Sequence, residues 1–297
     1  MRSGFVNLIG RPNVGKSSIL NHLIGVKLSI VTDRPQTTRK SMKFIYTDEK
    51  SQIIFFDNPG FQDPKNKLGQ EMQNIIYNNM KDADLDIYVM DNSLENGRLD
   101  NKVLDLARED KNKKIVIINK CDLLKEDELE MLIQKYKELD LFIDVYPVSA
   151  VTGYGFKELL DGIYNIMPEG PLYYDEEMIT DTMTREIMEE ILREKFLIFL
   201  DEEIPHGINI ETEEYIEDED SISIRDIVYL ERENHKAIVI GKNGTMINRI
   251  INAAKKDMQE FTNKKVRLKI DIKIRKNWRK NIGIVKSWIK WRRKQLF

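Results

Sequence analysis

The sequence contains few of the residues that mark special classes of protein. Its 297 residues include one Cys, three His, eight Pro and fifteen Gly. The single cysteine, Cys121, excludes a disulfide within the chain, and we expect a reducing, cytoplasmic setting. No apolar run approaches the roughly 18 residues that cross a membrane, and residues 1–10 lack the pattern of a signal peptide. With 41% hydrophobic residues, the composition also excludes collagen-like and fully disordered chains.

Charge is abundant but unevenly distributed. The net charge of −3 conceals an acidic segment, residues 171–235, with 5 Lys or Arg against 21 Asp or Glu. Residues 236–297 have the opposite balance, 19 against 3. A basic block of this size indicates an anionic partner, either a nucleic acid or a membrane surface, unless it only neutralises the acidic segment beside it.

The length and the hydrophobic patterns predict two domains joined near residue 170. In residues 1–169, short apolar runs alternate with helical patterns, which is typical of an α/β domain with a mostly parallel sheet. The Pro- and Gly-containing residues 168–171 open a linker, which we assign to residues 170–182. Residues 183–297 predict a smaller α+β domain of order α-β-β-α-α-β, with a period-two strand at 266–274.

A phosphate-binding motif follows the first predicted strand. Residues 10–17 fit G-x-x-x-x-G-K-[ST] and open a predicted helix, the context that this motif requires. Backbone N–H groups would surround phosphate oxygens, Lys16 would reach the β- and γ-phosphates, and Ser17 would bind Mg²⁺. The alternative is a Gly-rich turn between strand and helix. The nucleotide-binding residues predicted here are Gly10, Asn13, Val14, Gly15, Lys16, Ser17 and Ser18.

A second motif, Asp57-Asn-Pro-Gly60, follows another apolar strand. An Asp at this edge can hold the outer shell of the Mg²⁺ ion, and the Gly60 N–H could meet the γ-phosphate. Taken alone, the four residues make only a good turn.

A third motif, Asn119-Lys120-Cys121-Asp122, indicates a preference for guanine. The Asp122 carboxylate can accept hydrogen bonds from the ring N–H and the exocyclic amine of guanine, a pair that adenine does not offer, which disfavours an ATPase. Asn119 and the stem of Lys120 would position and cover the base. Ser149 and Ala150 follow the next strand, where backbone could meet the guanine carbonyl.

The order of these motifs resembles that of the translation-factor-related small GTPases, over residues 1–167. The resemblance implies that a Thr of the effector loop binds Mg²⁺ and the γ-phosphate. Thr37 and Thr38 are the candidates, and we prefer Thr38, directly before an Arg. A solvated polar loop is the alternative. The residues expected to serve hydrolysis are Lys16, Thr38 and Gly60, with Ser17, Thr38 and Asp57 around the metal.

The chain departs from Ras-type GTPases at Phe61, where those enzymes place a water-orienting Gln. We expect turnover well below about 1 s⁻¹, and the rival hypothesis is a nucleotide-gated binding module without useful hydrolysis. Asn13 resembles the Asn with which some GTPases help to bind K⁺, an ion that acts there like an arginine finger. The alternative is that Asn13 only stabilises its loop.

The basic segment contains a G-x-x-G sequence, residues 241–244, between an apolar segment and a predicted helix. Such a loop is the backbone clamp of KH modules, which grip about four nucleotides; alone it could be an ordinary tight turn. The element order, the basic residues and the adjacent GTPase favour the KH interpretation. The RNA-binding residues predicted on this basis are Lys236, Ile240, Gly241, Lys242, Asn243, Gly244 and Arg249.

Residues 235–247, 254–259 and 193–195 together resemble the Era family, bacterial GTPases of ribosome assembly. The resemblance runs over nearly the whole chain. It implies GTP and GDP as ligands and a KH domain that binds the 3′ end of small-subunit ribosomal RNA during assembly of the small subunit. We expect a monomer.

The tail contains Trp278, Trp288 and Trp291 among many basic residues. These rings could stack on unpaired bases or lie at a membrane interface. We favour packing on the KH sheet for at least one of them, because burial of aromatic area outweighs most single contacts. The alternative function is a membrane-surface GTPase on the inner face of the cell membrane, which would bind anionic lipid through this tail.

Overall fold

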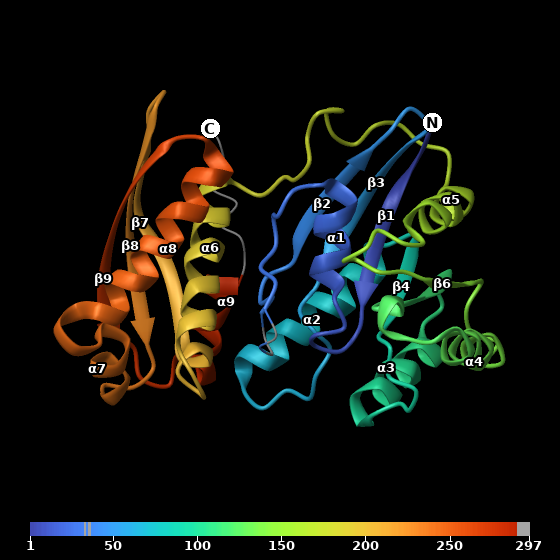
Figure 1. Ribbon diagram of the computed structural model, residues 1–297, viewed down its shortest axis with the longest axis horizontal. Helices are drawn as coiled ribbons and strands as arrows, with labels where there is room; N and C mark the ends of the chain where they lie inside the picture. Colours follow the sequence, from blue (N-terminus) through green and yellow to red (C-terminus); the bar gives the residue numbers. More distant parts are fainter. Residues whose placement is uncertain (33, 35–36, 290–297) are drawn as a thin grey trace. The chain divides into compact units, whose positions relative to one another are not determined.

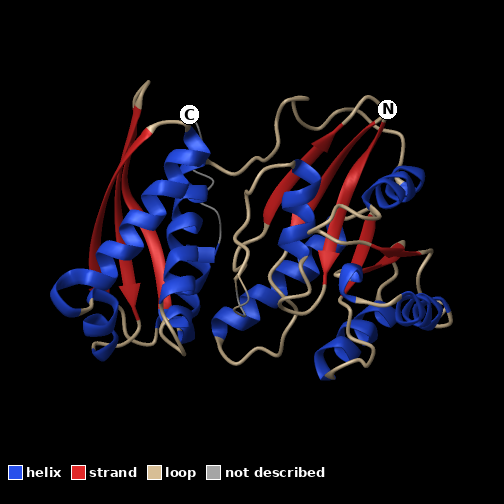
Figure 2. Cartoon of the chain, in the orientation of Figure 1, coloured by secondary structure: helices blue, strands red, loops and turns tan. Residues whose placement is uncertain are grey.

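The structure, a computed structural model, describes residues 1–32, 34 and 37–289 (Figure 1). The chain forms two compact units with the main boundary between Asp181 and Thr182. Helices and strands alternate along the first unit, whereas the second has a small sheet and fewer helices (Figure 2). Within the described ranges, every helix is too short or too polar to cross a bilayer.

The first unit is built on a six-stranded sheet of order β2-β3-β1-β4-β5-β6. Only β2 runs antiparallel to its neighbour, so the predicted mostly parallel sheet is confirmed. The strands are β1 (Arg2–Ile9), β2 (Met42–Thr47), β3 (Ser51–Asp57), β4 (Leu85–Met90), β5 (Lys114–Ile118) and β6 (Val145–Pro147). The helices are α1 (Lys16–Ile24), α2 (Lys67–Asp82), α3 (Arg98–Glu109), α4 (Glu126–Lys137) and α5 (Phe156–Ile166).

Helices on both faces of this sheet explain the continuous apolar runs of the sequence. Every residue of β3 and β4 is buried, as expected for strands covered on both sides. Because β1, β3, β4 and β5 are mutually parallel, the loops that follow them leave the same edge of the sheet. Ligands of open α/β sheets bind at this edge, and the phosphate, D-x-P-G and N-K-x-D motifs all follow strands that end there.

Much of the predicted linker is bound to the first unit. The buried Gln52 side chain accepts hydrogen bonds from the N–H groups of Tyr173 and Tyr174, at 2.7 and 3.0 Å, and donates to the Tyr174 carbonyl at 2.9 Å. Further along, the Ile45 N–H donates to the Ile179 carbonyl at 2.9 Å. The segment therefore follows β2 and β3 as an ordered strap up to the unit boundary.

The second unit contains a three-stranded sheet of order β7-β8-β9. Its elements are α6 (Thr184–Phe199), β7 (Ile208–Glu217), β8 (Ser221–Leu230), α7 (Asn234–Ile240), α8 (Thr245–Thr262), β9 (Lys265–Ile274) and α9 (Ile282–Ile289). The first six confirm the predicted order α-β-β-α-α-β. Helices α6 and α8 pack against each other and against the sheet, and they bury the apolar residues of its strands.

Two of the three tail tryptophans belong to the core of this unit. Trp278 is 1% and Trp288 7% exposed, with ring centroids 5.0 Å apart. The Trp278 indole N–H donates to the Gly207 carbonyl at 3.0 Å, and Trp288 packs on the Tyr229 ring at 4.9 Å. The prediction that at least one Trp packs on the sheet is confirmed, while Trp291 lies outside the described residues.

Candidate nucleotide and RNA sites

The phosphate loop turns its lysine back onto its own carbonyls. The Lys16 ammonium, almost wholly buried, donates to the carbonyls of Gly10 at 3.0 Å and Arg11 at 3.2 Å. Burial lowers the pKa of Lys16 to about 8; the Asp57 carboxylate opposes the shift, and the Arg11 charge adds to it. A phosphate oxygen placed inside this loop would take over these donors and restore the positive charge.

The side chains predicted to hold Mg²⁺ are brought together. Ser17 Oγ donates to Asp57 Oδ2 at 2.9 Å and lies 3.2 Å from Thr38 Oγ1. The Thr37 hydroxyl instead donates to the Arg34 carbonyl at 2.5 Å, so the structure places Thr38 at the cluster. Hydroxyl and carboxylate oxygens are the donor set that Mg²⁺ prefers, and the residues fit the ion.

Ser29 belongs to the same cluster, although no motif marked it. Its hydroxyl donates to Asp57 Oδ2 at 2.5 Å, and its backbone is held by the Asn21 side chain, which accepts from the Ser29 N–H at 3.0 Å and donates to its carbonyl at 2.9 Å. Ser29 therefore orients the Asp57 carboxylate.

The residues after Asp57 explain the departure from the Ras pattern. A Cβ atom at Gly60 would lie 2.7 Å from the Pro12 nitrogen, so only glycine permits this approach to the phosphate loop. The next residue, Phe61, donates its N–H to the Gly10 carbonyl at 2.9 Å, and its ring is buried in the core with Ile76 and Tyr88. The ring is thus a core residue with no means of orienting a water molecule.

Asn119 joins three loops of the predicted guanine site. Its side-chain amide donates to the Val14 carbonyl at 2.8 Å, and its oxygen accepts from the Ala150 N–H at 3.4 Å. Gly15 has a φ of +97°, and a Cβ there would lie 2.1 Å from Asn119 Nδ2. The contact therefore requires glycine at this position.

The remaining guanine-site residues lie around Asn119. Lys120 crosses to the phosphate loop and donates to the Asn13 carbonyl at 2.8 Å. Asp122 is exposed, which leaves its carboxylate accessible to a base. Ser149 is buried, and its hydroxyl accepts from the Thr152 N–H at 3.1 Å, which shapes the loop carrying Ala150.

A pocket runs along the phosphate side of this site. Its walls come from the phosphate loop, from residues 30–32 and 37–38 of the effector loop, and from Gly60 and Lys120. The predicted residues that line it are Asn13, Gly15, Lys16, Ser17, Ser18, Thr38, Gly60 and Lys120.

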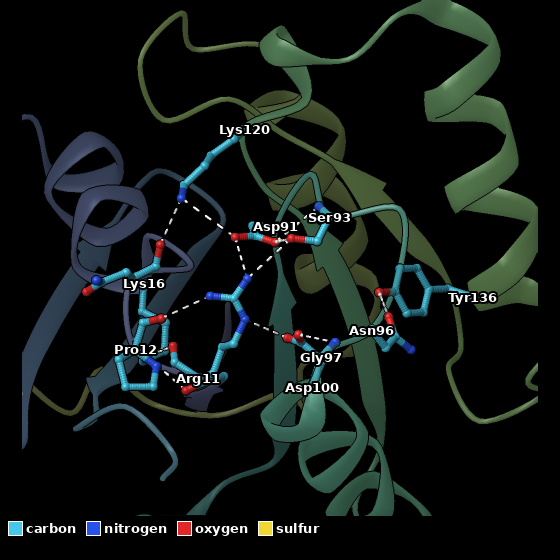
Figure 3. A network of polar contacts seen from close by, with 12 residues as sticks. Arg11, Pro12, Lys16, Asp91, Ser93, Asn96, Gly97, Asp100, Lys120 and Tyr136 are labelled. Atoms are coloured by element: carbon cyan, nitrogen blue, oxygen red, sulfur yellow. Dashed lines mark hydrogen bonds and ion pairs between the residues drawn. The ribbon is translucent and has the colours of Figure 1, made fainter. Parts of the chain in front are cut away.

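The sequence motifs did not reveal an ion-pair network beside the phosphate loop (Figure 3). Arg11 occupies a variable position of the motif, and its guanidinium binds Asp91 at 2.7 Å and Asp100 at 2.8 Å. Burial by itself lowers the pKa of Arg11, but the two carboxylates outweigh this effect and raise the pKa above its ordinary value. No local pattern could have identified the pairs, because the partners lie 80 and 89 residues away in the chain.

The G-x-x-G residues form the turn between α7 and α8. Gly241 and Gly244 have φ angles of +74° and +76°, which favour glycine, and a Cβ at Gly241 would lie 2.8 Å from the Met246 nitrogen. Lys242 and Asn243 are exposed at the tip. The loop therefore presents backbone and a positive charge, as a clamp on a nucleic-acid backbone requires.

The other predicted RNA-binding residues flank this turn. Lys236 and Arg249 are exposed and Ile240 is half-buried. The Arg249 guanidinium lies over the Phe199 ring, 4.4 Å from its centroid, which holds the charge beside α6.

Comparison with known proteins identifies the family. Residues 5–120 match the model of a family described as 50S ribosome-binding GTPase, and residues 203–279 match that of the KH domain. GTPase Era of Caldicellulosiruptor saccharolyticus is 40% identical over 289 residues, 96% of each chain. The chain belongs to the Era family of GTPases. GTPase Era of Caldanaerobacter subterraneus subsp. tengcongensis is 42% identical, over 96% of this chain and 97% of that one.

Solved Era structures share the whole fold. A crystal structure of Era in complex with MgGDPNP and nucleotides 1506–1542 of 16S ribosomal RNA matches with a TM-score of 0.92 at 30% identity, covering 97% of this chain and 98% of that one. Aquifex aeolicus Era bound to GDP and AlF4⁻ matches with a TM-score of 0.91 at 30% identity, covering 97% and 99%. These matches confirm the predicted family and fold. This Era-family chain is a GTPase with a KH domain.

Proposed function

We propose that this Era-family GTPase is a GTP-dependent switch that binds the 3′ region of small-subunit ribosomal RNA through its KH domain, during assembly of the small subunit. The observation that carries the proposal is the presence, in one chain, of the phosphate, D-x-P-G and N-K-x-D loops at one edge of a sheet and of a G-x-x-G turn between two helices. The Era relative bound to both MgGDPNP and a 16S ribosomal RNA segment supports the pairing of the two sites.

In the proposed mechanism, the phosphate loop binds the triphosphate and Lys16 moves from its backbone carbonyls to the phosphates. Ser17, Thr38 and Asp57 would hold Mg²⁺, which supplies charge to neutralise the phosphates. The Thr38 hydroxyl lies 3.2 Å from Ser17 Oγ. Thr38 would therefore contact both the metal and the γ-phosphate when they are bound, and it would lose this contact after hydrolysis.

Hydrolysis would depend on positioning and charge, because Phe61 is a core residue. Backbone N–H groups at Gly60 and in the phosphate loop, together with Lys16, would stabilise the charge on the transferred group. Asn13, at the rim of the pocket, would help to bind a K⁺ ion that adds positive charge there. Phosphate release measured in K⁺ and in Na⁺ tests this part, and equal rates would remove K⁺ from the mechanism.

The guanine site is tested with Asp122→Asn. We expect GTP affinity to fall by about a hundredfold or more, because an unpaired polar group replaces two charge-assisted hydrogen bonds. Titration with a fluorescent GDP measures the change, and Asp127→Asn, on the exposed first turn of α4, is the control. Unchanged affinity would show that Asp122 does not bind the base.

The RNA site is tested with the full chain and a short single-stranded RNA from the 3′ end of the small-subunit ribosomal RNA. Binding is measured with GDP and with a non-hydrolysable GTP analogue at two salt concentrations. We expect tighter binding with the analogue, and loss of binding in the double variant Gly241→Asp with Gly244→Asp.

Asn252→Asp, an exposed position of α8, adds negative charge away from the loop and serves as the control. Equal RNA affinity in both nucleotide states, changing only with salt concentration, would mean that the RNA is held by non-specific electrostatic attraction. Sedimentation with anionic phospholipid vesicles would then test the membrane-surface alternative, and binding to the vesicles would favour it.

A further inference from the structure

Asp91 connects two motifs that recognise opposite ends of the nucleotide. It directly follows β4, at the sheet edge from which the nucleotide loops leave, and is 7% exposed. Its Oδ2 atom lies 2.7 Å from the Arg11 guanidinium, in the phosphate loop, and 3.7 Å from the Lys120 ammonium, in the N-K-x-D motif. Figure 3 shows the carboxylate between the two cations.

The local chain fixes the carboxylate in this position. Its other oxygen, Oδ1, accepts from the Ser93 hydroxyl at 2.7 Å and from the Ser93 N–H at 3.2 Å. Burial disfavours the charged form, but the Ser93 hydrogen bonds and the Arg11 and Lys120 charges hold the pKa of Asp91 below its ordinary value. Asp91 is therefore an anion at neutral pH.

The two cations differ in what else holds them. Arg11 has a second carboxylate, Asp100, which also accepts from the Gly97 N–H at the start of α3. Lys120 has the Asn13 carbonyl, at 2.8 Å, besides Asp91. Removing the charge of Asp91 would leave Arg11 paired, whereas Lys120 would lose its only carboxylate among the ion pairs of the described residues.

The end of the Lys120 side chain is thus held between the phosphate loop and Asp91. An ammonium fixed at both contacts restricts the conformations of its four-carbon stem, and an ordered apolar stem can cover the face of a base. A stem that is already ordered also loses less conformational entropy when the nucleotide binds. This role is distinct from reading the edge of the base, which belongs to Asp122.

We propose that Asp91 is a positioning residue for nucleotide binding, which holds Lys120 against the phosphate loop so that its stem covers the base. The proposal rests on the guanine site proposed above. Because Asp91 acts on the cover and lies away from the γ-phosphate cluster of Ser17, Thr38 and Asp57, it should set the affinity for the nucleotide and leave the hydrolysis step unchanged.

The test compares three neutralised carboxylates in the full chain. We expect Asp91→Asn to raise the KM for GTP and the dissociation rate of fluorescent GDP by about tenfold, equivalent to about 1.4 kcal/mol, with kcat within about twofold. Asp100→Asn also removes a partner of Arg11 but does not touch Lys120, so we expect a change below about threefold. Asp105 forms an exposed ion pair with Arg108 within α3. Asp105→Asn is therefore the control for the loss of one negative charge outside the nucleotide site.

Two further readouts separate positioning from a general loss of structure. Asp91→Glu retains the charge and should recover most of the affinity. Inosine triphosphate lacks the exocyclic amine of guanine. Asp91→Asn should weaken the binding of inosine triphosphate and of GTP by the same factor. Asp122→Asn should instead remove the preference for GTP over inosine triphosphate. Thermal unfolding of each variant shows whether it is folded, so that a loss of affinity in a folded Asp91→Asn protein is assigned to the missing charge.

Equal effects of Asp91→Asn and Asp100→Asn on KM would overturn the proposal, since the network would then only brace the fold. A change confined to kcat would also overturn it. If Asp122→Asn leaves GTP binding unchanged, the proposed assignment of the guanine site is wrong. If Asp122→Asn weakens binding and Asp91→Asn does not, only the role of Asp91 is lost.

Discussion

Single residues in the nucleotide site are fixed by close contacts that one residue type permits. Gly15 allows the Asn119 amide to reach the Val14 carbonyl, and Gly60 allows the backbone to approach Pro12. A methyl group at either position would overlap a nitrogen atom at 2.1 or 2.7 Å. The motif glycines therefore serve the packing of loops on one another as well as access to phosphate.

Lys16 predicts a pH dependence of nucleotide binding. Its pKa of about 8 means that the free protein loses this positive charge above pH 8, while bound phosphates raise the pKa again. Binding then requires uptake of a proton, so GDP affinity should fall by about tenfold per pH unit above 8 and stay level below about 7.

Isothermal titration between pH 6.5 and 8.8, below the pH at which the guanine ring N–H ionises, in buffers with different ionisation heats, measures both the affinity and the proton uptake. Lys16→Arg keeps its charge over this range, so its affinity, although lower, should not change with pH. A level affinity up to pH 8.8 in the unchanged protein would contradict the prediction.

At the scale of elements, β8 of the KH domain contains a buried carboxyl group that opposes folding at neutral pH. Asp226 is fully buried, and its Oδ1 accepts from the Thr212 hydroxyl at 2.7 Å. Burial raises the pKa of Asp226 to about 7; the Thr212 hydrogen bond opposes the shift, and the Glu189 charge adds to it. In the folded state this group is protonated at a pH where the unfolded chain is already ionised.

The folded state therefore binds more protons than the unfolded state between about pH 4 and pH 7, and stability should decline as the pH rises through this window, by up to about 1.4 kcal/mol per unit. Asp226→Asn keeps an acceptor for Thr212 and cannot ionise. We expect it to be more stable than the unchanged protein at pH 8, with the gain disappearing near pH 4. Urea unfolding at both pH values measures this, and an equal gain at both would refute the titration.

We expect the buried tryptophan of α9, Trp288, to contribute to the stability of the protein and not to RNA binding. Trp288 packs on Trp278 and Tyr229, so Trp288→Ala removes a buried ring and should lower the free energy of unfolding by about 3 kcal/mol. Lys286→Ala, on the exposed side of α9, should change it little. Denaturant unfolding tests the prediction, which fails if Trp288→Ala keeps full stability and loses only RNA or vesicle binding.

At the scale of the whole molecule, the segment between the two units is tied to the first unit by Gln52. Gln52→Leu removes all three side-chain hydrogen bonds to this segment, together with one to Thr47, and takes these partners from the backbone groups of Tyr173 and Tyr174. We expect cleavage within residues 173–181 to become at least about tenfold faster in limited proteolysis, because local opening costs less. Gln134→Leu, exposed on α4, is the matched control. An unchanged cleavage rate would mean that the strap is held by other contacts.

Much of the fold and of the nucleotide site could be predicted because both depend on local signals. The phosphate loop needs consecutive residues from 10 to 17, and the continuous apolar runs of β3 and β4 indicate strands covered on both faces. The KH order followed from periodicity and from the turn at 241–244. The strand expected at residues 266–274 begins one residue earlier, at Lys265, because its first bridge depends on the neighbouring strand.

The residues that sequence reasoning missed share one property, contact across a long stretch of chain. Ser29 meets Asp57 and Arg11 meets Asp91 only because the parallel strands deliver their loops to one edge of the sheet. The sequence left several interpretations of the tail tryptophans open. The structure shows that two of them, Trp278 and Trp288, are buried, and that Trp288 packs on Tyr229 of the sheet.

The sequence by itself determined the chemistry of the chain: the nucleotide motifs, the guanine-directed carboxylate, the glycine clamp and the basic segment, because each is a short run whose spacing is set by backbone geometry. Only the tertiary structure decided which of two threonines stands beside Ser17, that the Phe61 ring is part of the core, and that Asp91 links Arg11 to Lys120. Those outcomes depend on the packing of segments far apart in the chain, which no local pattern encodes.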